Sequence, residues 1–202
     1  MYSQNNEEQI VIRYFGNTGG TFLDIGANDG ITLSNTFALS NIGWAGTLVE
    51  ASPKAFARLQ ECYQHMKGYE LIHTAVGAHN GKVILDESGE HLGKGDVALL
   101  STIKPTEKDR WLDHVFNQVT VPCVNFAGMM CLTKHKKFDF ISMDIEGMEL
   151  DVLPQMDLQK MGCKMLCVEF NGQRQDEYDD IVLPQGYKLI HKNAENLIYA
   201  KT

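Results

Sequence analysis

Carboxylates recur near the ends of the apolar, strand-like runs of this sequence. Asp24 and Glu50 each lie at the end of a short apolar run, and Asp144 and Glu169 do the same further along the chain. A buried carboxylate is costly unless a cation or a hydrogen-bond donor meets it. Ligands of an open α/β sheet bind beyond the carboxyl ends of its strands, so we expect these acids to converge on one crevice.

The stretch Asp24–Gly30 reads D-I-G-A-N-D-G and predicts a tight turn after a buried strand. A dinucleotide site of the dehydrogenase kind would show G-x-G-x-x-G, with a phosphate on a helix N-terminus. Acidic residues flank this turn instead, so it would repel a pyrophosphate and suit a cationic ligand that carries hydroxyls. Glu50 follows Gly30 by twenty positions, a spacing at which a second-strand carboxylate accepts hydrogen bonds from ribose. S-Adenosylmethionine, with its sulfonium, amino group and ribose, fits this chemistry.

Other residues at the same edge of the sheet are candidates for contact with this cofactor. The segment Thr74–Gly77 ends a third strand-like run, where its backbone would line an adenine pocket. Ser34 precedes the next helix, and capping that helix is its simpler role. The predicted cofactor-binding residues are Asp24, Gly26, Ala27, Asn28, Asp29, Gly30, Ser34, Glu50, Ala51, Ala75, Val76 and Asp144.

A second acidic stretch, D-I-E-G-M-E, begins at Asp144 and predicts the catalytic residues. Asp144 stands at a strand end and is our candidate for a general base that accepts the proton of an attacking hydroxyl. Glu146 and Glu149 are three residues apart and would share one face of the following helix. Glu149 also suits the first turn of that helix, where a carboxylate complements the helix dipole.

A metal-assisted mechanism is the alternative. Asp144, Glu169 and Asn171 could hold one Mg²⁺-like ion through oxygen ligands. Such an ion would lower the pKa of the acceptor hydroxyl and orient it. Because the sequence shows no dedicated acidic cage, we favour the mechanism without a metal and keep a divalent metal at these residues as the alternative.

The elements that would position these residues alternate along the first half of the chain, which favours a parallel sheet with right-handed crossovers. Ser52 and Pro53 have the types preferred at the N-cap and first position of a helix. Predicted helices cover residues 7–15, a segment with Leu33, Phe37 and Ile42 on one face that closes at Gly43, a segment from 53, residues 146–156 and a segment around 178–182. Predicted strands cover residues 21–25, 46–50, 70–76, 82–86, 97–103, 119–124 with Pro122 at an edge, 138–145 and 165–170, and then a C-terminal antiparallel hairpin of 187–191 and 196–200.

Length and composition fit one domain over residues 1–202, with an N-terminal helical part in 1–18 and an inserted hairpin or lid in 81–124. A net charge of −8 argues against a nucleic-acid partner. No apolar run is long enough to span a membrane, and the polar, acidic start of the sequence is unlike a signal peptide. Five cysteines without a C-x-x-C pair indicate reduced thiols in a cytoplasmic protein.

The same stretches carry a family resemblance. T-F-L-D-I-G-A-N-D-G, G-W-A-G-T-L-V-E-A-S-P, T-A-V-G and F-D-F-I-S-M-D-I-E-G-M-E-L-D-V-L together resemble the FkbM family of S-adenosylmethionine-dependent methyltransferases. The resemblance implies a Rossmann-like class I methyltransferase fold, with a mostly parallel seven-stranded sheet, helices on both faces and an antiparallel last strand. It places Asp24–Gly30 on the cofactor loop, Glu50 at the ribose and Asp144–Glu149 among the active-site acids. Ala51-Ser52-Pro53 stands where relatives often have E-P-x-P, but Pro53 still begins the helix.

The sequence therefore predicts an S-adenosylmethionine-dependent O-methyltransferase that acts on a hydroxyl of a saccharide or a sugar-containing metabolite and releases S-adenosylhomocysteine. The resemblance implies this acceptor class. The alternative is a non-catalytic S-adenosylmethionine-binding module or partner subunit. An NAD-dependent enzyme is disfavoured because G-x-G-x-x-G is missing, and the N-P-P-[YF]-like motif of amino-group methylation is also absent. Trp44, Trp111 and His73 are expected to be packing residues, although Trp111 could stack on a sugar ring.

Overall fold

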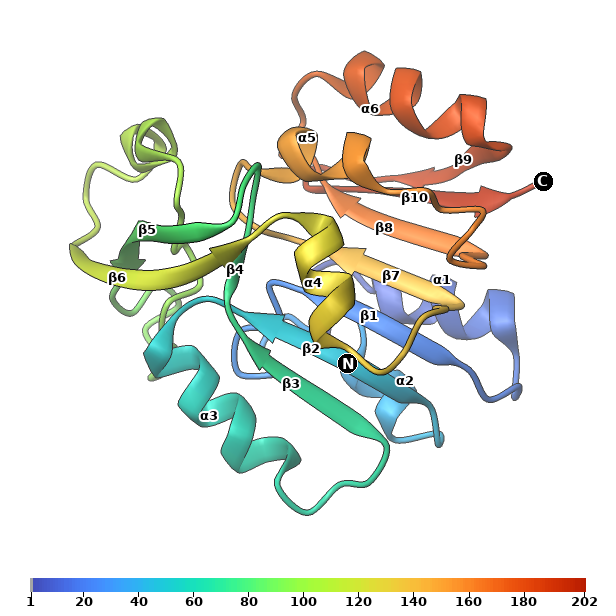
Figure 1. Ribbon diagram of the computed structural model, residues 1–202, viewed down its shortest axis with the longest axis horizontal. Helices are drawn as coiled ribbons and strands as arrows, with labels where there is room; N and C mark the ends of the chain where they lie inside the picture. The colour runs from blue at the N-terminus through green and yellow to red at the C-terminus, as the bar shows by residue number, and fades with distance from the viewer. Residues whose placement is uncertain (1) are drawn as a thin grey trace.

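A seven-stranded sheet organises the computed structural model, which describes residues 2–202 (Figure 1). Five strands run parallel, and the C-terminal hairpin extends the sheet in the antiparallel sense. In spatial order the strands are β3 (Tyr69–His73), β2 (Ala45–Glu50), β1 (Thr21–Ile25), β7 (Phe140–Met143), β8 (Met165–Glu169), β10 (Asn196–Lys201) and β9 (Tyr187–Lys192). The strand order reverses between β1 and β7, so the fold class predicted from the sequence is confirmed.

Alternating side chains of these strands pack into two separate hydrophobic cores, one on each face of the sheet. On one face Leu23 and Ile141 pack with residues of α4 (Phe126–Leu132), α5 (Glu149–Val152) and α6 (Gln175–Val182). On the other face Phe22 and Phe140 pack with residues of α1 (Glu7–Phe15), α2 (Phe37–Ser40) and α3 (Pro53–Tyr63). Figure 1 shows α4 in front of the sheet and α1 behind it. Strands buried on both faces are typical of a parallel sheet covered by helices.

Residues 81–124 contain a hairpin in which β5 (Gly81–Ser88) pairs antiparallel with β6 (Phe116–Val124), and the predicted run at 97–103 is not one of its strands. The hairpin lies to the left of the main sheet in Figure 1 and forms a second, three-stranded sheet with β4 (Ala75–Val76). The prediction that Pro122 marks an edge strand is wrong, since β6 is central in this sheet. Proline is tolerated there because the ladder to β4 begins only at Cys123.

Two predicted strands in this region are also wrong in extent. The run predicted at 70–76 divides at Thr74, where the chain leaves β2 and pairs with β6 instead; the Thr74 hydroxyl donates to the Pro122 carbonyl. Residues 97–103 form a loop in which only Thr102 makes an isolated bridge, to Asp86. Ala98 has a φ of 59°, which a regular strand does not accommodate.

The helix predicted from Leu33 to Gly43 is much shorter, since α2 has four residues. Side chains replace helical hydrogen bonds at its start: the Ser34 hydroxyl accepts from the backbone N–H groups of Thr36 and Phe37. Leu33 instead forms an isolated β-bridge with Ser3, and the Ile42 side chain is exposed. Local bonds of this kind compete with helix formation.

Three predictions about residues near the helices, one of a helix cap and two of packing, are confirmed. The Ser52 hydroxyl caps α3 by accepting from the Ala55 N–H, with Pro53 as the first helical residue. His73 is a satisfied strand histidine that stacks on Phe56. Trp44 is buried and donates its indole N–H to the Thr18 carbonyl.

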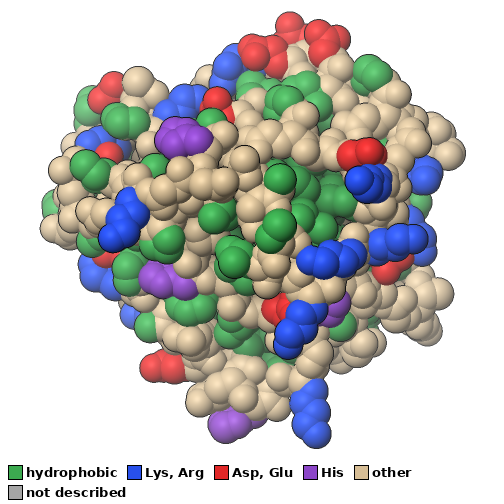
Figure 2. Space-filling view, in the orientation of Figure 1, with side chains coloured by type: hydrophobic (Ala, Val, Ile, Leu, Met, Phe, Trp, Pro, Cys, Tyr) green, Lys and Arg blue, Asp and Glu red, His purple; other side chains and the backbone are tan. Residues whose placement is uncertain are grey.

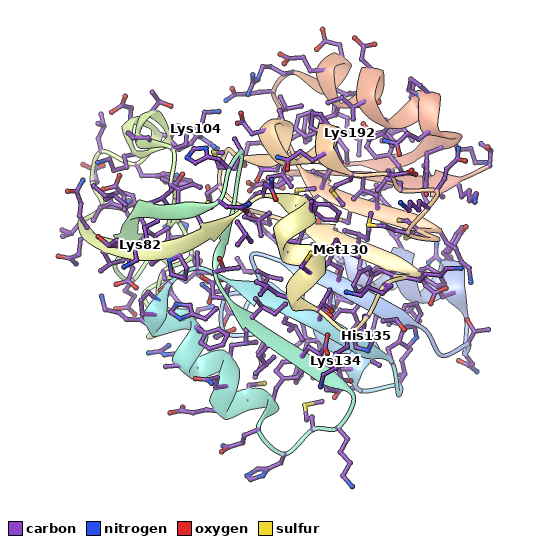
Figure 3. All side chains as sticks on the ribbon, in the orientation of Figure 1. Lys82, Lys104, Met130, Lys134, His135 and Lys192 are labelled. Atoms are coloured by element: carbon purple, nitrogen blue, oxygen red, sulfur yellow. The ribbon has the colours of Figure 1, made fainter. Side chains whose placement is uncertain are left out.

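The surface around α4 combines apolar and charged side chains. Figure 2 shows hydrophobic side chains near the centre of this face, with Lys and Arg beside them and acidic groups elsewhere. Lys134 and His135 follow α4 and lie beside β3 in Figure 3, where the Lys134 N–H donates to the Glu70 carboxylate. Within residues 2–202, no helix has the length and apolar character needed to cross a bilayer.

Candidate active site

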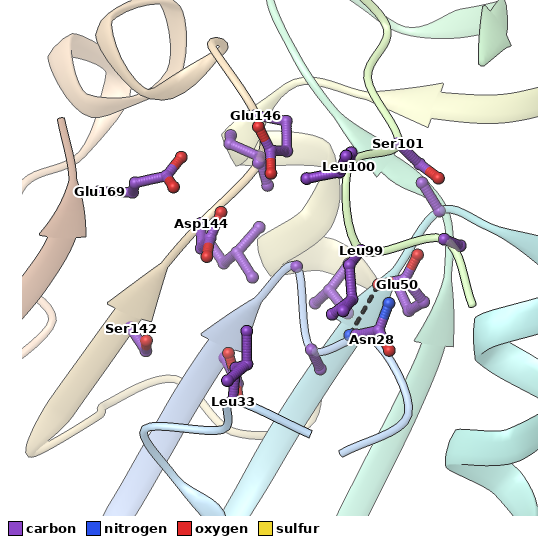
Figure 4. Close-up of a pocket in the computed structure, with 18 of the residues that line it drawn as sticks. Asn28, Leu33, Glu50, Leu99, Leu100, Ser101, Ser142, Asp144, Glu146 and Glu169 are labelled. Carbon is purple, nitrogen blue, oxygen red and sulfur yellow. Dashed lines mark hydrogen bonds between the residues drawn. The ribbon is translucent and has the colours of Figure 1, made fainter. Parts of the chain in front are cut away.

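A cavity of about 390 Å³ opens beyond the carboxyl ends of the central strands. The four strand-end acids Asp24, Glu50, Asp144 and Glu169 all line it, as their places in the sequence predict. Figure 4 shows Asp144, Glu146 and Glu169 on one side of the cavity and Glu50 with Asn28 on another. The volume lies within the range of small-molecule sites, and the strand-order reversal is where open α/β sheets bind ligands.

Asp24 presents a buried carboxylate to the floor of this cavity. Its side chain is 5% exposed and accepts a 2.6 Å hydrogen bond from the Thr36 hydroxyl. Burial, with a contribution from repulsion by Asp144, raises its pKa to about 7. Gly26, two residues later, has a φ of 90°, and a Cβ there would lie 1.6 Å from the Asp144 carbonyl oxygen. Glycine at this position therefore lets the β1 loop approach β7, which fixes where Asp24 and Asp144 meet.

Glu50 is held by the backbone of two loops. One carboxylate oxygen accepts from the Asn28 N–H at 2.8 Å, and the other accepts from the Ser52 N–H at 2.6 Å. Burial outweighs these bonds and raises the Glu50 pKa to about 7. Each oxygen keeps a second lone pair, so the carboxylate can still accept from two neighbouring hydroxyls of a ligand.

The acidic segment after β7 is a strained turn and not the first turn of a helix, which corrects the predicted helix over 146–156. Glu146 has a φ of 49°, and α5 begins only at Glu149, followed by a 3₁₀ turn at Leu153–Gln155. The Glu149 carboxylate accepts from the Ile145 and Gly147 N–H groups at 2.7 and 3.0 Å and so stabilises this turn. The expected shared helix face of Glu146 and Glu149 is therefore wrong.

These acids form a compact cluster of like charge with Glu169. Single carboxylate oxygens of Asp144, Glu149 and Glu169 lie within 4.8 Å of one another. Asp144 is exposed to the cavity, whereas Glu149 and Glu169 are 3% and 8% exposed. Although the Asp144 side chain is open to the cavity, the protein that surrounds the cavity desolvates its carboxylate and raises its pKa to about 6. Burial raises the pKa of Glu149 to about 7. Burial and the neighbouring carboxylates hold the pKa values of Glu146 and Glu169 well above their usual range.

The loop between β5 and β6 supplies another part of the wall. His91 and Trp111 line the cavity, and the His91 Nδ1 atom lies 2.9 Å from the His114 Nε2 atom. Among the described residues, the Trp111 indole N–H and the His114 Nδ1 atom are buried and find no hydrogen-bond partner. Arg110 also lines the cavity and pairs with Glu107 at 3.1 Å. These rings and donors offer a surface for an oxygen-rich ligand.

Most of the predicted site residues meet at this cavity, and three do not. Asp29, Gly30 and Glu149 lie behind the wall: Asp29 accepts from Ile31 and Thr32, and Gly30 packs on Leu59 and Tyr63 of α3. The predicted residues that line the cavity are Asp24, Gly26, Ala27, Asn28, Ser34, Glu50, Ala51, Ala75, Val76, Asp144, Glu146, Glu169 and Asn171.

Sequence reasoning missed several other lining residues, especially in the loop at 98–101. This loop is held by long-range bonds, such as that from the Asn28 amide to the Val97 carbonyl at 2.9 Å, which no local pattern indicates. Ser142 and Asn35 were also missed; they face each other across 3.2 Å and line the cavity. Alternation along the strand before Asp144 could have indicated Ser142, because both side chains point to one face.

Solved structures with the same fold are methyltransferases of diverse kinds. A ribosomal protein L11 methylase of Lactobacillus delbrueckii subsp. bulgaricus matches with a TM-score of 0.52 and 11% identity, over 97% of this chain and 77% of that one. A precorrin-6y C5,15-methyltransferase of Geobacter metallireducens matches with a TM-score of 0.52 and 9% sequence identity, over 99% of this chain and 93% of that one. A 16S rRNA N2 G1207 methyltransferase of T. thermophilus, in complex with AdoMet and guanosine, matches with a TM-score of 0.52 and 11% sequence identity, over 97% of this chain and 42% of that one. At such identities the likeness shows the fold alone.

The fold is therefore that of the Rossmann-like, S-adenosylmethionine-dependent methyltransferases. The methyltransferase FkbM domain matches residues 24–189, so the chain belongs to the FkbM methyltransferase family. A search of curated protein sequences finds no significant match.

Proposed function

We propose that this protein transfers a methyl group from S-adenosylmethionine to a hydroxyl of a saccharide or a sugar-containing metabolite. The observation that carries the proposal is the meeting of Asp24, Glu50 and Asp144 at one cavity of about 390 Å³. A cationic, hydroxyl-bearing cofactor matches a cavity whose strand ends are acidic. Membership of the FkbM family supports the methyl donor.

The cofactor's two ends have distinct partners in this proposal. The Glu50 carboxylate accepts hydrogen bonds from the ribose hydroxyls, and Ala75 and Val76 line the adenine pocket. Asp24 and the backbone from Gly26 to Asn28 lie near the methionine part. The sulfonium lowers the pKa of nearby carboxyls, so binding favours the ionised form of Asp24.

The acceptor enters between the acidic segment after β7 and the loop that carries Trp111. The Trp111 indole ring lines the cavity and gives a face on which a sugar ring stacks. Asp144 accepts the hydroxyl proton as the oxygen attacks the methyl carbon, and S-adenosylhomocysteine leaves with the electron pair of the broken S–C bond. Most of the rate comes from holding the methyl group, sulfur and oxygen in line.

Binding and turnover test the proposal separately. We expect calorimetry to give one S-adenosylhomocysteine site per chain, and labelled S-adenosylmethionine to methylate at least one member of a glycan panel. Asp144→Asn should spare cofactor binding and slow transfer by a factor of roughly 10² to 10⁴. Absence of cofactor binding would refute the proposal.

The same assay addresses the other readings of this cavity. A set of RNA oligonucleotides belongs in the panel, because one solved structure with this fold is named as a 16S rRNA methyltransferase. The net charge of −8 leads us to expect no RNA methylation. Cofactor binding without transfer to any acceptor would favour the non-catalytic module.

A further inference from the structure

Glu169 carries a buried carboxylate oxygen that no donor among residues 2–202 satisfies. Its Oε2 atom is inaccessible to water and has no hydrogen-bond partner in the described part of the chain, while the residue as a whole is 8% exposed and lines the cavity. A native structure rarely leaves a buried carboxylate oxygen without a hydrogen-bond partner, because the cost of desolvation is then uncompensated. This atom therefore points to a partner that comes from outside the chain.

Two further carboxylates face the same point. Single oxygens of Asp144, Glu149 and Glu169 all lie within 4.8 Å of one another. Among residues 2–202, no Lys or Arg forms an ion pair with any of the three. In Figure 4 the Asp144 and Glu169 side chains extend toward the same side of the cavity.

We propose that Asp144, Glu149 and Glu169 form a binding site for one divalent, oxygen-preferring cation at the wall of the cavity. Two oxygens on one ion are at most twice the metal–oxygen distance apart, about 4.2 Å for Mg²⁺ and about 4.8 Å for Ca²⁺. The separations in the cluster do not exceed the larger limit, and an ion of the size of Mg²⁺ requires the carboxylates to move closer together.

The donor set defines the class of ion. All three ligands are carboxylates, with no histidine or cysteine among them, which suits Mg²⁺, Mn²⁺ or Ca²⁺ and disfavours Zn²⁺. The Glu149 carboxylate is already oriented by the Ile145 and Gly147 N–H groups, so it is fixed in place before an ion arrives. Asp144 is accessible from the cavity and leaves room for water or an acceptor hydroxyl on the ion.

The site deepens the proposed function, because a hydroxyl on such an ion would have a lowered pKa beside the transferred methyl group. Cation binding itself does not rest on methyl transfer and can be measured alone. A competing occupant is the amino group of the cofactor's methionine part, which is also a cation. The two occupants are distinguished by a variant of Glu169. If the cation binds there, the variant loses affinity for the cation and keeps its affinity for the cofactor; if the amino group binds there, the variant loses affinity for the cofactor.

The test titrates Mn²⁺ into cofactor-free protein and follows the paramagnetic resonance signal of the free ion. We expect one saturable site per chain, with affinity at least tenfold lower in Glu169→Gln and in Asp144→Asn. Glu195→Gln is the matched control, because Glu195 lines the same cavity outside the cluster and should keep Mn²⁺ affinity within about threefold. Unfolding midpoints of all variants show that each is folded.

A second titration, with S-adenosylhomocysteine in metal-free buffer, separates the occupants. We expect Glu169→Gln to bind it within about threefold of the unaltered protein. Absence of Mn²⁺ binding, equal Mn²⁺ affinity in Glu169→Gln, or loss of S-adenosylhomocysteine affinity in that variant would overturn the proposed site. Methyl transfer that continues in excess chelator would remove the site from catalysis while leaving the proposed function intact.

Discussion

Asp24→Asn should stabilise the cofactor-free protein while it abolishes tight cofactor binding. Asparagine keeps the size of the side chain and an oxygen that accepts from the Thr36 hydroxyl, which now lies 2.6 Å from the carboxylate. It removes a charge that is 5% exposed and has no cationic partner within residues 2–202. The new amide group faces the cavity, where water can satisfy it.

The size of the effect follows from the Asp24 pKa, which burial raises from 3.8 to about 7. Between these values the unfolded chain has released the proton while the folded protein retains it, so the free energy of unfolding falls as pH rises. Each pKa unit corresponds to about 1.4 kcal/mol, which gives a full cost near 4 kcal/mol at pH 8. At pH 5 the cost falls to roughly 1–2 kcal/mol, because protonation relieves most of it.

The assay is urea unfolding of cofactor-free protein at pH 5 and pH 8. We expect the advantage of Asp24→Asn over the unaltered protein to grow by about 3 kcal/mol between the two pH values. Glu61→Gln on the exposed face of α3 is the control for loss of one negative charge and should stay within about 0.5 kcal/mol. An Asp24→Asn variant that is less stable at pH 8, or equally affected at both pH values, would refute the reasoning.

Other substitutions probe the remaining parts of the cavity. Glu50→Gln should weaken S-adenosylhomocysteine binding about tenfold, and it should abolish the preference for the ribose form over a 2′-deoxy analogue in calorimetry. Gly26→Ala should lower the free energy of unfolding by at least about 2 kcal/mol, because the new Cβ would collide with the Asp144 carbonyl. Trp111→Phe removes an unpaired N–H and should change stability by less than about 1 kcal/mol, but it should raise the KM for the acceptor; an unchanged KM places the acceptor elsewhere. The affinity of S-adenosylmethionine relative to S-adenosylhomocysteine should rise from pH 5.5 to pH 8, since only the former carries a sulfonium that gains from ionised Asp24; a flat ratio contradicts that contact.

The sheet and the meeting of the strand-end acids could be predicted because both follow from local patterns. Short apolar runs that end in an acid, separated by helical segments, specify parallel strands whose carboxyl ends share one edge. Asp24 and Glu169 are far apart in the chain, yet each needs only its own strand to bring it to the cavity. The C-terminal hairpin could also be predicted from the sequence, since two strands and a short turn define it.

The turns were less predictable, because their conformation depends on distant partners. The i, i+3 spacing of Glu146 and Glu149 is typical of a helix. The Glu149 carboxylate instead accepts hydrogen bonds from the backbone N–H groups of Ile145 and Gly147, and the helix begins only at Glu149. Ser34 shortens α2 in the same way. The loop at 98–101 takes its position from the Asn28 amide and from Thr102, which donates to the Glu146 carbonyl at 2.7 Å.

Backbone strain and electrostatic cost occur together at this cavity. Asn28, Glu146 and Asn171 follow β1, β7 and β8, and each has a φ near 50° where most residues avoid positive values. The same loops hold carboxylates whose pKa values burial raises. A sheet needs neither feature to fold, so both are costs that the rest of the fold offsets, and their coincidence at one cavity is typical of a binding site. A cofactor with a sulfonium, and a cation between Asp144 and Glu169, would each offset part of these costs by restoring a positive charge beside acids that the chain itself leaves unpaired.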